Sequence, residues 1–208
     1  MPQEKSIKNN NIKYLNLFLL SSLALFMAWS AYKPHDYTTW WQETAPVFIG
    51  LLVLFVSREK TPLTYLIIIL LWLHSLVLLL GAHYTYAEVP LFEFGERNNY
   101  DKVGHFMQGF VPAMVARELL LRTSPLRQGK WLSIIIVLSC LGISAMYELI
   151  EWSAAILSSD GAEAFLGTQG DVWDTQKDMM WAGIGAIAAL ICLGRLHDKV
   201  LKSANYIK

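Results

Sequence analysis

The sequence contains little charge and almost no cysteine. Only 16% of its 208 residues are charged, whereas 54% are hydrophobic. This balance is too apolar for an ordinary soluble domain. Cys140 and Cys192 both fall inside long apolar runs, so they predict neither a disulfide framework nor a cysteine metal site. The sequence also has no internal repeat, no low-complexity stretch and no loop long enough for a second domain.

Long hydrophobic runs are what the sequence has in abundance. A helix needs about 20 apolar residues to cross about 30 Å of hydrocarbon. Six spans are expected, at approximately 14–32, 40–57, 62–84, 101–122, 131–157 and 176–197. We therefore expect an all-α polytopic membrane protein: a single domain over 1–208 that forms a six-transmembrane-helix bundle. The fourth span is the least hydrophobic, so we expect it to face protein or water more than lipid.

The basic residues predict the orientation of this bundle. A cytoplasmic N-terminus places 13 of the 17 Lys and Arg residues inside and leaves four outside: Lys33, Arg97, Lys102 and Lys177. This bias is the one that the positive-inside rule expects, and it makes both termini cytoplasmic. The outer connections then carry eleven acids. Because no small-residue cleavage site follows the first apolar run, we expect a retained anchor.

Three carboxylates begin the sixth span. Asp171, Asp174 and Asp178 lie at i, i+3 and i+7, and at about 100° per residue they share one helix face. Like charges so close repel one another unless a cation neutralises them. Their spacing is similar to the acidic motif of membrane prenyltransferases, in which magnesium holds a diphosphate. That likeness covers nine residues and is an analogy for metal–phosphate binding.

Ionisable groups on two other spans are expected at the same depth. On the fourth span, Asp101, His105 and Gln108 share one face. On the fifth, Glu148 and Glu151 lie one turn apart, about 9 to 14 Å inside the span. Burying a charged side chain at membrane depth costs free energy, so an ionisable residue there usually indicates a functional site. We therefore expect acids from three separate spans to gather in one pocket below the outer surface.

A bound hard cation would explain how these carboxylates and the imidazole can lie close together. Carboxylates with one imidazole suit Mg, Mn, Ca or Zn. The expected metal ligands are Glu151, Asp171, Asp174 and Asp178. The expected catalytic residues are His105, Glu148 and Asp101, with His105 or Glu148 as the general base and Asp101 orienting the imidazole ring. The expected polar lining is His83, Gln108, Gln169 and Gln176.

Each of these residues also has a structural explanation. Asp101 and Asp174 could serve only the first turns of their helices, where negative charge suits the helix dipole. A single histidine such as His105 is more often a packing residue than a ligand. Glu148 and Glu151 are harder to explain in this way, because no Lys or Arg lies near them on the fifth span.

Three motifs carry a resemblance to a known family. They are Tyr100–Phe106, Tyr147–Trp152 and Leu166–Met179, which reads LGTQGDVWDTQKDM. With them the chain resembles the YjdF family of bacterial inner-membrane proteins, which carry a domain of unknown function. The resemblance implies a bacterial inner membrane location and the same six-span layout. A fainter similarity is to VanZ-like membrane proteins.

Three functions remain open. The first is a metal-dependent membrane enzyme at the periplasmic face, acting on a lipid or lipid-linked phosphate. The second is a proton- or cation-coupled transporter, although the inner halves of the fifth and sixth spans are nearly all apolar. The third is a structural membrane protein without catalysis. The expected partners are the lipid bilayer and a second copy of the chain in a homo-oligomer, with no nucleic acid.

Overall fold

Six long α-helices and a short hairpin make up the part of the chain described in a computed structural model, residues 2–94, 97–157 and 168–207. Leu166 and Gly167 of the third sequence motif lie outside these described residues. The elements in order are α1 (Pro2–Ala31), α2 (Tyr37–Ser57), α3 (Tyr65–Tyr84), η1 (Tyr86–Glu88), β1 (Glu93–Phe94), β2 (Arg97–Asn98), α4 (Tyr100–Thr123), α5 (Lys130–Leu157) and α7 (Asp174–Ser203).

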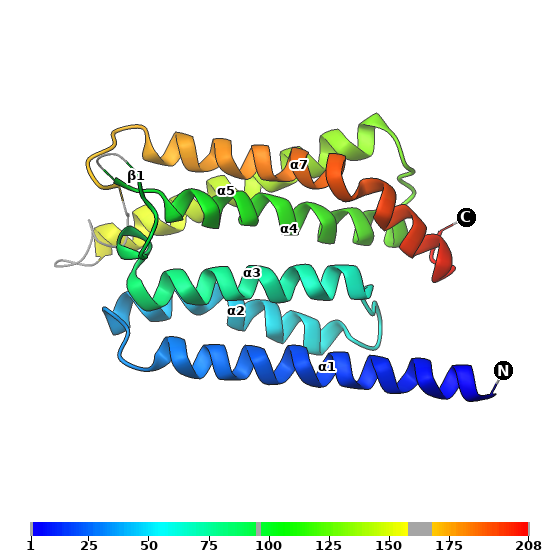
Figure 1. Cartoon of the computed structure of the whole chain (residues 1–208). Coiled ribbons are helices and arrows are strands. Elements are labelled where there is room, and N and C mark those ends of the chain that lie inside the picture. Colours follow the sequence, from blue (N-terminus) through cyan, green and yellow to red (C-terminus); the bar gives the residue numbers. More distant parts are fainter. Residues whose placement is uncertain (1, 95–96, 158–167, 208) are drawn as a thin grey trace.

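The helices form two groups of three (Figure 1). α1 and α2 both pack on α3, while α4, α5 and α7 pack on one another. The contact between α3 and α4 joins the two groups. Both termini lie at the same end of the bundle, and the β1–β2 hairpin lies at the opposite end (Figure 1). We call these the terminal end and the hairpin end.

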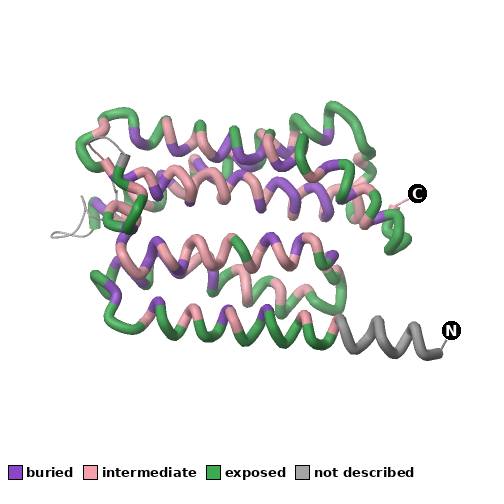
Figure 2. The backbone as a smooth tube through the Cα atoms, in the orientation of Figure 1, coloured by how far each residue is buried: buried purple, intermediate pink, exposed green. Residues whose placement is uncertain are grey.

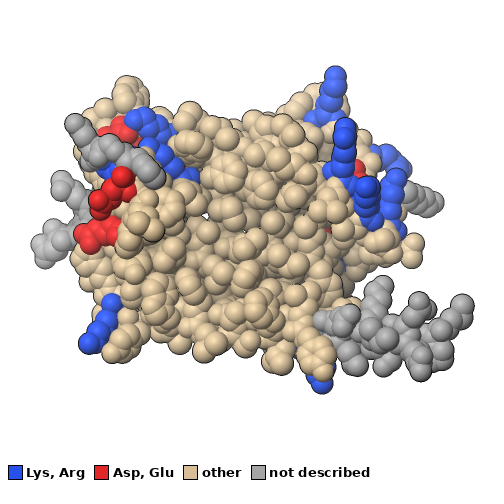
Figure 3. Space-filling model, viewed as in Figure 1, with Lys and Arg blue, Asp and Glu red and all other residues tan. Residues whose placement is uncertain are grey.

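Five of the six helices are long and apolar enough to cross a membrane. The exception is α4, the span expected to be least hydrophobic, which carries Asp101, Arg117 and Glu118 in buried positions. On the face shown in Figure 3, uncharged residues form a broad band across the middle of the bundle, and charged side chains gather at its two ends. This distribution suits a protein embedded in a bilayer.

The helix ends differ from the predicted spans for local reasons. Pro62 was expected in the first turn of the third span, but α3 begins at Tyr65. Thr64 precedes it in an extended conformation, because Glu118 of α4 accepts hydrogen bonds from its backbone N–H at 2.8 Å and its hydroxyl at 2.6 Å. α7 starts two residues before the predicted 176 and extends beyond 197 to Ser203.

The buried side chains of α4, α5 and α7 form stripes along the helix faces that meet (Figure 2). In α5 the stripe repeats every four residues from Leu132 to Glu148. In α7 it begins with Asp174 and Asp178 and continues through small residues such as Ala182 and Gly185. The same stripes that build the core therefore carry carboxylates toward the other helices at the hairpin end.

Two glycines bring α4 and α7 into backbone contact. A methyl group at Gly109 would lie 1.8 Å from the carbonyl oxygen of Ala182, and one at Gly185 would lie 2.0 Å from that of Phe106. Such distances leave no room for any side chain. Small residues at these positions let the two helix backbones approach closely, which fixes the depth at which their polar residues meet.

Candidate functional site

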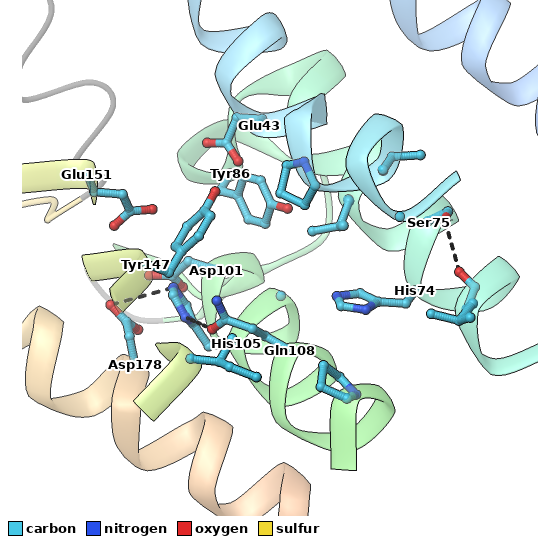
Figure 4. Close-up of a pocket in the computed structure, with 18 of the residues that line it drawn as sticks. Glu43, His74, Ser75, Tyr86, Asp101, His105, Gln108, Tyr147, Glu151 and Asp178 are labelled. Carbon is cyan, nitrogen blue, oxygen red and sulfur yellow. Dashed lines mark hydrogen bonds and ion pairs between the residues drawn. The ribbon is translucent and has the colours of Figure 1, made fainter. Parts of the chain in front are cut away.

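A cavity of about 320 Å³ lies between the two helix groups. Residues of α2, α3, η1, α4, α5 and α7 line it (Figure 4). Its polar part is nearest the hairpin end, because Asp101 and Asp174 lie in the first turns of α4 and α7. The predicted site residues Asp101, His105, Gln108, Glu151, Asp174 and Asp178 all line this cavity. A volume of this size falls in the range of small-molecule sites.

His105, Glu148 and Asp178 form the tightest polar group. They come from α4, α5 and α7, and one ligand atom of each lies within 4.8 Å of the other two. Nδ1 of His105 is 3.8 Å from Oε1 of Glu148, and its Nε2 is 3.8 Å from Oδ2 of Asp178. One nitrogen and two carboxylate oxygens at such separations can converge on a single hard cation.

Two oxygen atoms of this group are buried without a hydrogen-bond partner. Oε1 of Glu148 and Oδ1 of Asp178 make no hydrogen bond, although these residues are only 9% and 4% exposed. An unpaired buried polar atom costs free energy, so such atoms require an explanation. A bound cation would provide one, because it would replace the missing hydrogen-bond donors.

Gln108 orients the imidazole of His105. Nδ1 of His105 lies 3.0 Å from Oε1 of Gln108, which follows it by three residues on α4. An amide oxygen only accepts hydrogen bonds, so Nδ1 donates and Nε2 keeps its lone pair in the neutral ring. Nε2 faces Asp178 (Figure 4). The ring is therefore held in the tautomer that can bind a metal through Nε2.

Arg97 neutralises three of the predicted acids. Its guanidinium pairs with Asp101, with Asp174 at 2.6 Å and with Asp171 at 3.3 Å. Burial alone would lower the pKa of Arg97, but the hydrogen bond to Asp174 and the charges of the neighbouring carboxylates raise it above its ordinary value. Asp101, Asp174 and Asp178 could also group around a metal, but the guanidinium already supplies the positive charge at the first two.

Asp171 lies outside the cavity lining and has two cationic partners. Lys177 forms an ion pair with it beside Arg97. The hydrogen bond from Lys177 and that from the backbone N–H of Trp173 hold the pKa of Asp171 below its usual value. Asp171 was expected to bind metal, whereas its partners here are protein cations that tie the start of α7 to β2.

The opposite wall of the cavity carries a second polar set. Glu43 of α2, Tyr86 of η1, and Tyr147 and Glu151 of α5 line it (Figure 4). The ring of Tyr86 fits between α3 and α4 because Gly81 and Gly104 have no side chains there; added methyl groups would lie 2.4 and 2.7 Å from it. Burial raises the pKa of Tyr86 well above its ordinary value, so the phenol stays protonated.

Three of the residues predicted to line the site lie elsewhere. His83 stacks on Trp29 with ring centroids 4.3 Å apart, and its Nδ1 lies 3.0 Å from the carbonyl oxygen of Ser30. It therefore joins α1 to α3. Gln169 exchanges two hydrogen bonds with the backbone of Asn98, at 2.9 and 3.1 Å, and Gln176 is exposed to solvent.

Sequence reasoning missed Arg97 and Glu43 as site residues. Arg97 stands four residues before Asp101, a spacing at which opposite charges often pair. Glu43 stands within the second predicted span, where an acid without a basic neighbour is as unusual as Glu151 is on the fifth. Both signals were available, but neither residue belongs to one of the three motifs.

A second buried polar network lies at the terminal end. Glu118 is fully buried and accepts hydrogen bonds from Thr64, from Arg122 at 2.8 Å and from Nε2 of His197 at 3.0 Å. Nδ1 of His197 accepts from Arg117 at 2.9 Å. Each charged group here has a partner, so this network holds α3, α4 and α7 together and leaves no ligand atom free.

Known proteins with similar sequences are also described as membrane proteins. A family model described as "Predicted membrane protein (DUF2238)" matches residues 15–199. The chain is 46% identical over 192 residues to the inner membrane protein YjdF of Escherichia coli (strain K12), covering 89% of this chain and 92% of that protein. No solved structure matches. These findings confirm the resemblance carried by the three motifs and the multi-pass inner membrane location.

Proposed function

The chain belongs to the DUF2238 family of predicted membrane proteins, and we propose that it is a metal-dependent membrane enzyme. Its metal site consists of His105, Glu148 and Asp178, and its substrate is a lipid or lipid-linked phosphate. The observation that carries this proposal is that Glu148 and Asp178 each have a buried oxygen without a hydrogen-bond partner and both carboxylates lie next to the imidazole of His105. A divalent cation of the Mg, Mn, Ca or Zn type would be bound by these two carboxylates and the imidazole.

The sequence suggested Glu151 as a metal ligand and Glu148 as a catalytic residue. In this proposal the two residues exchange these roles. Glu148 lies within ligand distance of His105 and Asp178. Glu151 lines the cavity without belonging to either ligand group found among the described residues. We assign its carboxylate the role of general base toward a substrate in the cavity, because Glu151 lines the cavity. Asp101 and Asp174 hold Arg97 against the group and balance its charge.

The reaction class is hydrolysis of a phosphate ester. A divalent cation lowers the pKa of a bound water and stabilises charge on the phosphoryl oxygens. The water oxygen bonds to phosphorus, the bond from phosphorus to the lipid oxygen breaks, and the leaving alcohol takes up the proton that the water loses. Glu151 carries that proton between the two oxygens.

Elemental analysis of the purified protein tests the metal site. We expect about one divalent metal ion per chain, and at least a tenfold lower content in both Glu148→Gln and Asp178→Asn. Glu88→Gln is the matched control, because Glu88 is an exposed acid at the hairpin end that does not line the cavity. Full metal content in both site variants would refute the proposal. Lack of metal in all proteins, with unchanged melting temperature on adding Mn²⁺ or Zn²⁺, would favour a purely structural role.

A cation- or proton-coupled transporter is the second candidate. A second pocket, of about 530 Å³, opens among residues of the terminal end, and Leu54 lines both this pocket and the site cavity. Because the two pockets meet at this one side chain, a rotation of Leu54 could join them into one continuous path. If Glu151→Gln abolishes a pH-dependent flux in liposomes while no metal binds, the transporter replaces the enzyme.

A further inference from the structure

The site cavity continues from its polar end into an apolar part. Beyond Glu43 it runs along α2 past Gly50 and Leu51 to Leu54, and the other walls are formed by Ile143 of α5 and by residues of α3, namely Leu71, Leu78, His74 and Ser75. At 1.5 Å per residue, the distance from Glu43 to Leu54 is about 16 Å. This is about half of the 30 Å hydrocarbon core, which is the depth of one leaflet.

One side of this cavity is poorly closed by helix packing. α2 packs against α3, and α5 packs against α4 and α7, but α2 and α5 make little direct contact among the described residues. Both helices expose large apolar side chains on their outer surfaces, Val53 on α2 and Ile150 on α5 among them. This apolar side is therefore where a hydrocarbon chain from the bilayer would enter the cavity.

Gly50 shows that the apolar part has free space. A methyl group added at Gly50 would meet nothing within 4 Å, although this residue lines the cavity. Apolar cavities that remain unfilled cost free energy and readily take up apolar ligands. The space beside Gly50 is thus suited to a hydrocarbon chain.

The polar end restricts the headgroup. No Lys or Arg lines the cavity, whereas Glu43 of α2 and Glu151 of α5 both face it without an ion pair among the described residues. A headgroup that carries hydroxyl or ammonium donors beside one phosphate would meet these acids favourably.

We propose that the substrate is a phospholipid with an amine- or hydroxyl-bearing headgroup, one chain of which enters between α2 and α5 and lies along Gly50 toward Leu54. This inference rests on the proposed function, because the metal site receives the single phosphate. Glu43 and Glu151 bind the donors of the headgroup. The side chain of Leu54 separates this end of the cavity from the second pocket and so sets the length of chain that is accepted.

Photolabelling in lipid nanodiscs tests this binding mode. The probe is a lysophosphatidylethanolamine with a diazirine at the end of its chain, and labelled peptides are located by mass spectrometry. We expect labels on the cavity-facing parts of α2 and α3 near Leu54 and Leu71. Gly50→Leu fills the cavity, and we expect it to reduce this labelling at least fivefold without changing the metal content.

Gly142→Leu is the matched control, because Gly142 is an exposed glycine of α5 that also has open space around it but does not line the cavity. It should label like the parent protein. Gly50→Ala and Gly50→Val should give graded reductions, which keeps the test valid if the leucine variant folds poorly. Equal labelling in the Gly50 and Gly142 variants, or labels only on bilayer-facing residues, would overturn the inference.

The same samples separate this inference from the proposed enzyme. If metal binds but labelling does not respond to Gly50, the lipid chain does not occupy the cavity and only this inference fails. If labelling responds to Gly50 but neither parent nor control binds metal, the cavity is a lipid site and the metal-dependent enzyme fails.

Discussion

Arg97 is the residue that determines which of the acids at the hairpin end are free to bind a cation. It pairs with Asp101, Asp171 and Asp174, so that Asp178 and Glu148 are left with unpartnered oxygens. On α7 the acid with a free ligand atom, Asp178, follows by one turn the last acid that pairs with Arg97, Asp174. One guanidinium thus divides the acids into a structural set and a candidate metal set.

Replacing Arg97 tests whether the acids divide into a structural set and a candidate metal set. Arg97→Gln leaves Asp101 and Asp174 buried without a cationic partner, and we expect a loss of unfolding free energy on the order of 3 kcal/mol. The melting temperature of the purified protein measures this loss. Arg97→Lys, which keeps the charge but not the forked geometry, should lose less. A melting temperature of Arg97→Gln equal to that of the parent would show that the acids do not depend on Arg97.

At the scale of elements, the close contact between α4 and α7 brings His105 to the depth of Asp178. Gly109 and Gly185 allow this contact, since their hydrogens face the carbonyl groups of the opposite helix. Each helix carries its polar residues on the same buried stripe as its glycine. Packing and site geometry are therefore set by the same few positions.

Alanine at these glycines should separate the helices. We expect Gly109→Ala and Gly185→Ala each to lower stability by about 1–3 kcal/mol, because a backbone must move to admit the methyl group, and to reduce metal content as well. Thermal unfolding and elemental analysis measure the two effects. Gly142→Ala, which meets open space, should change neither. A Gly109→Ala protein with parent stability and parent metal content would contradict the described packing.

The helices could be predicted from the sequence because hydrophobic runs and motif spacing are local signals. The three residues of the proposed metal site, His105, Glu148 and Asp178, could also be selected from the sequence, because each lies on the polar face of its helix. Which acids pair with Arg97 could not be predicted, because the pairing depends on the β1–β2 hairpin that carries Arg97 to α7. The terminal network of Glu118 and His197 escaped prediction for the same reason: its members lie 79 residues apart.

At the scale of the whole molecule, the two ends of the bundle differ. The hairpin end carries the cavity's polar part, and the terminal end carries both termini (Figures 1 and 3). The positive-inside bias predicts that the termini are cytoplasmic. The candidate site would then face the periplasm, and its lipid would come from the outer leaflet of the inner membrane.

Cysteine labelling of intact cells tests this orientation. In a Cys192→Ser background, Val172→Cys introduces an exposed thiol at the hairpin end, and Ala204→Cys introduces one at the terminal end. A membrane-impermeant maleimide should label the first in intact cells and the second only after permeabilisation. The reverse pattern would place the site at the cytoplasmic face.

The most direct test of the metal site is an anomalous difference map from crystals of the protein grown with Mn²⁺. We predict one peak within about 2.5 Å of His105 Nε2 and of a carboxylate oxygen from both Glu148 and Asp178. A map with no peak between these residues, or with its only peak beside Asp171 or Asp174, would contradict the central claim.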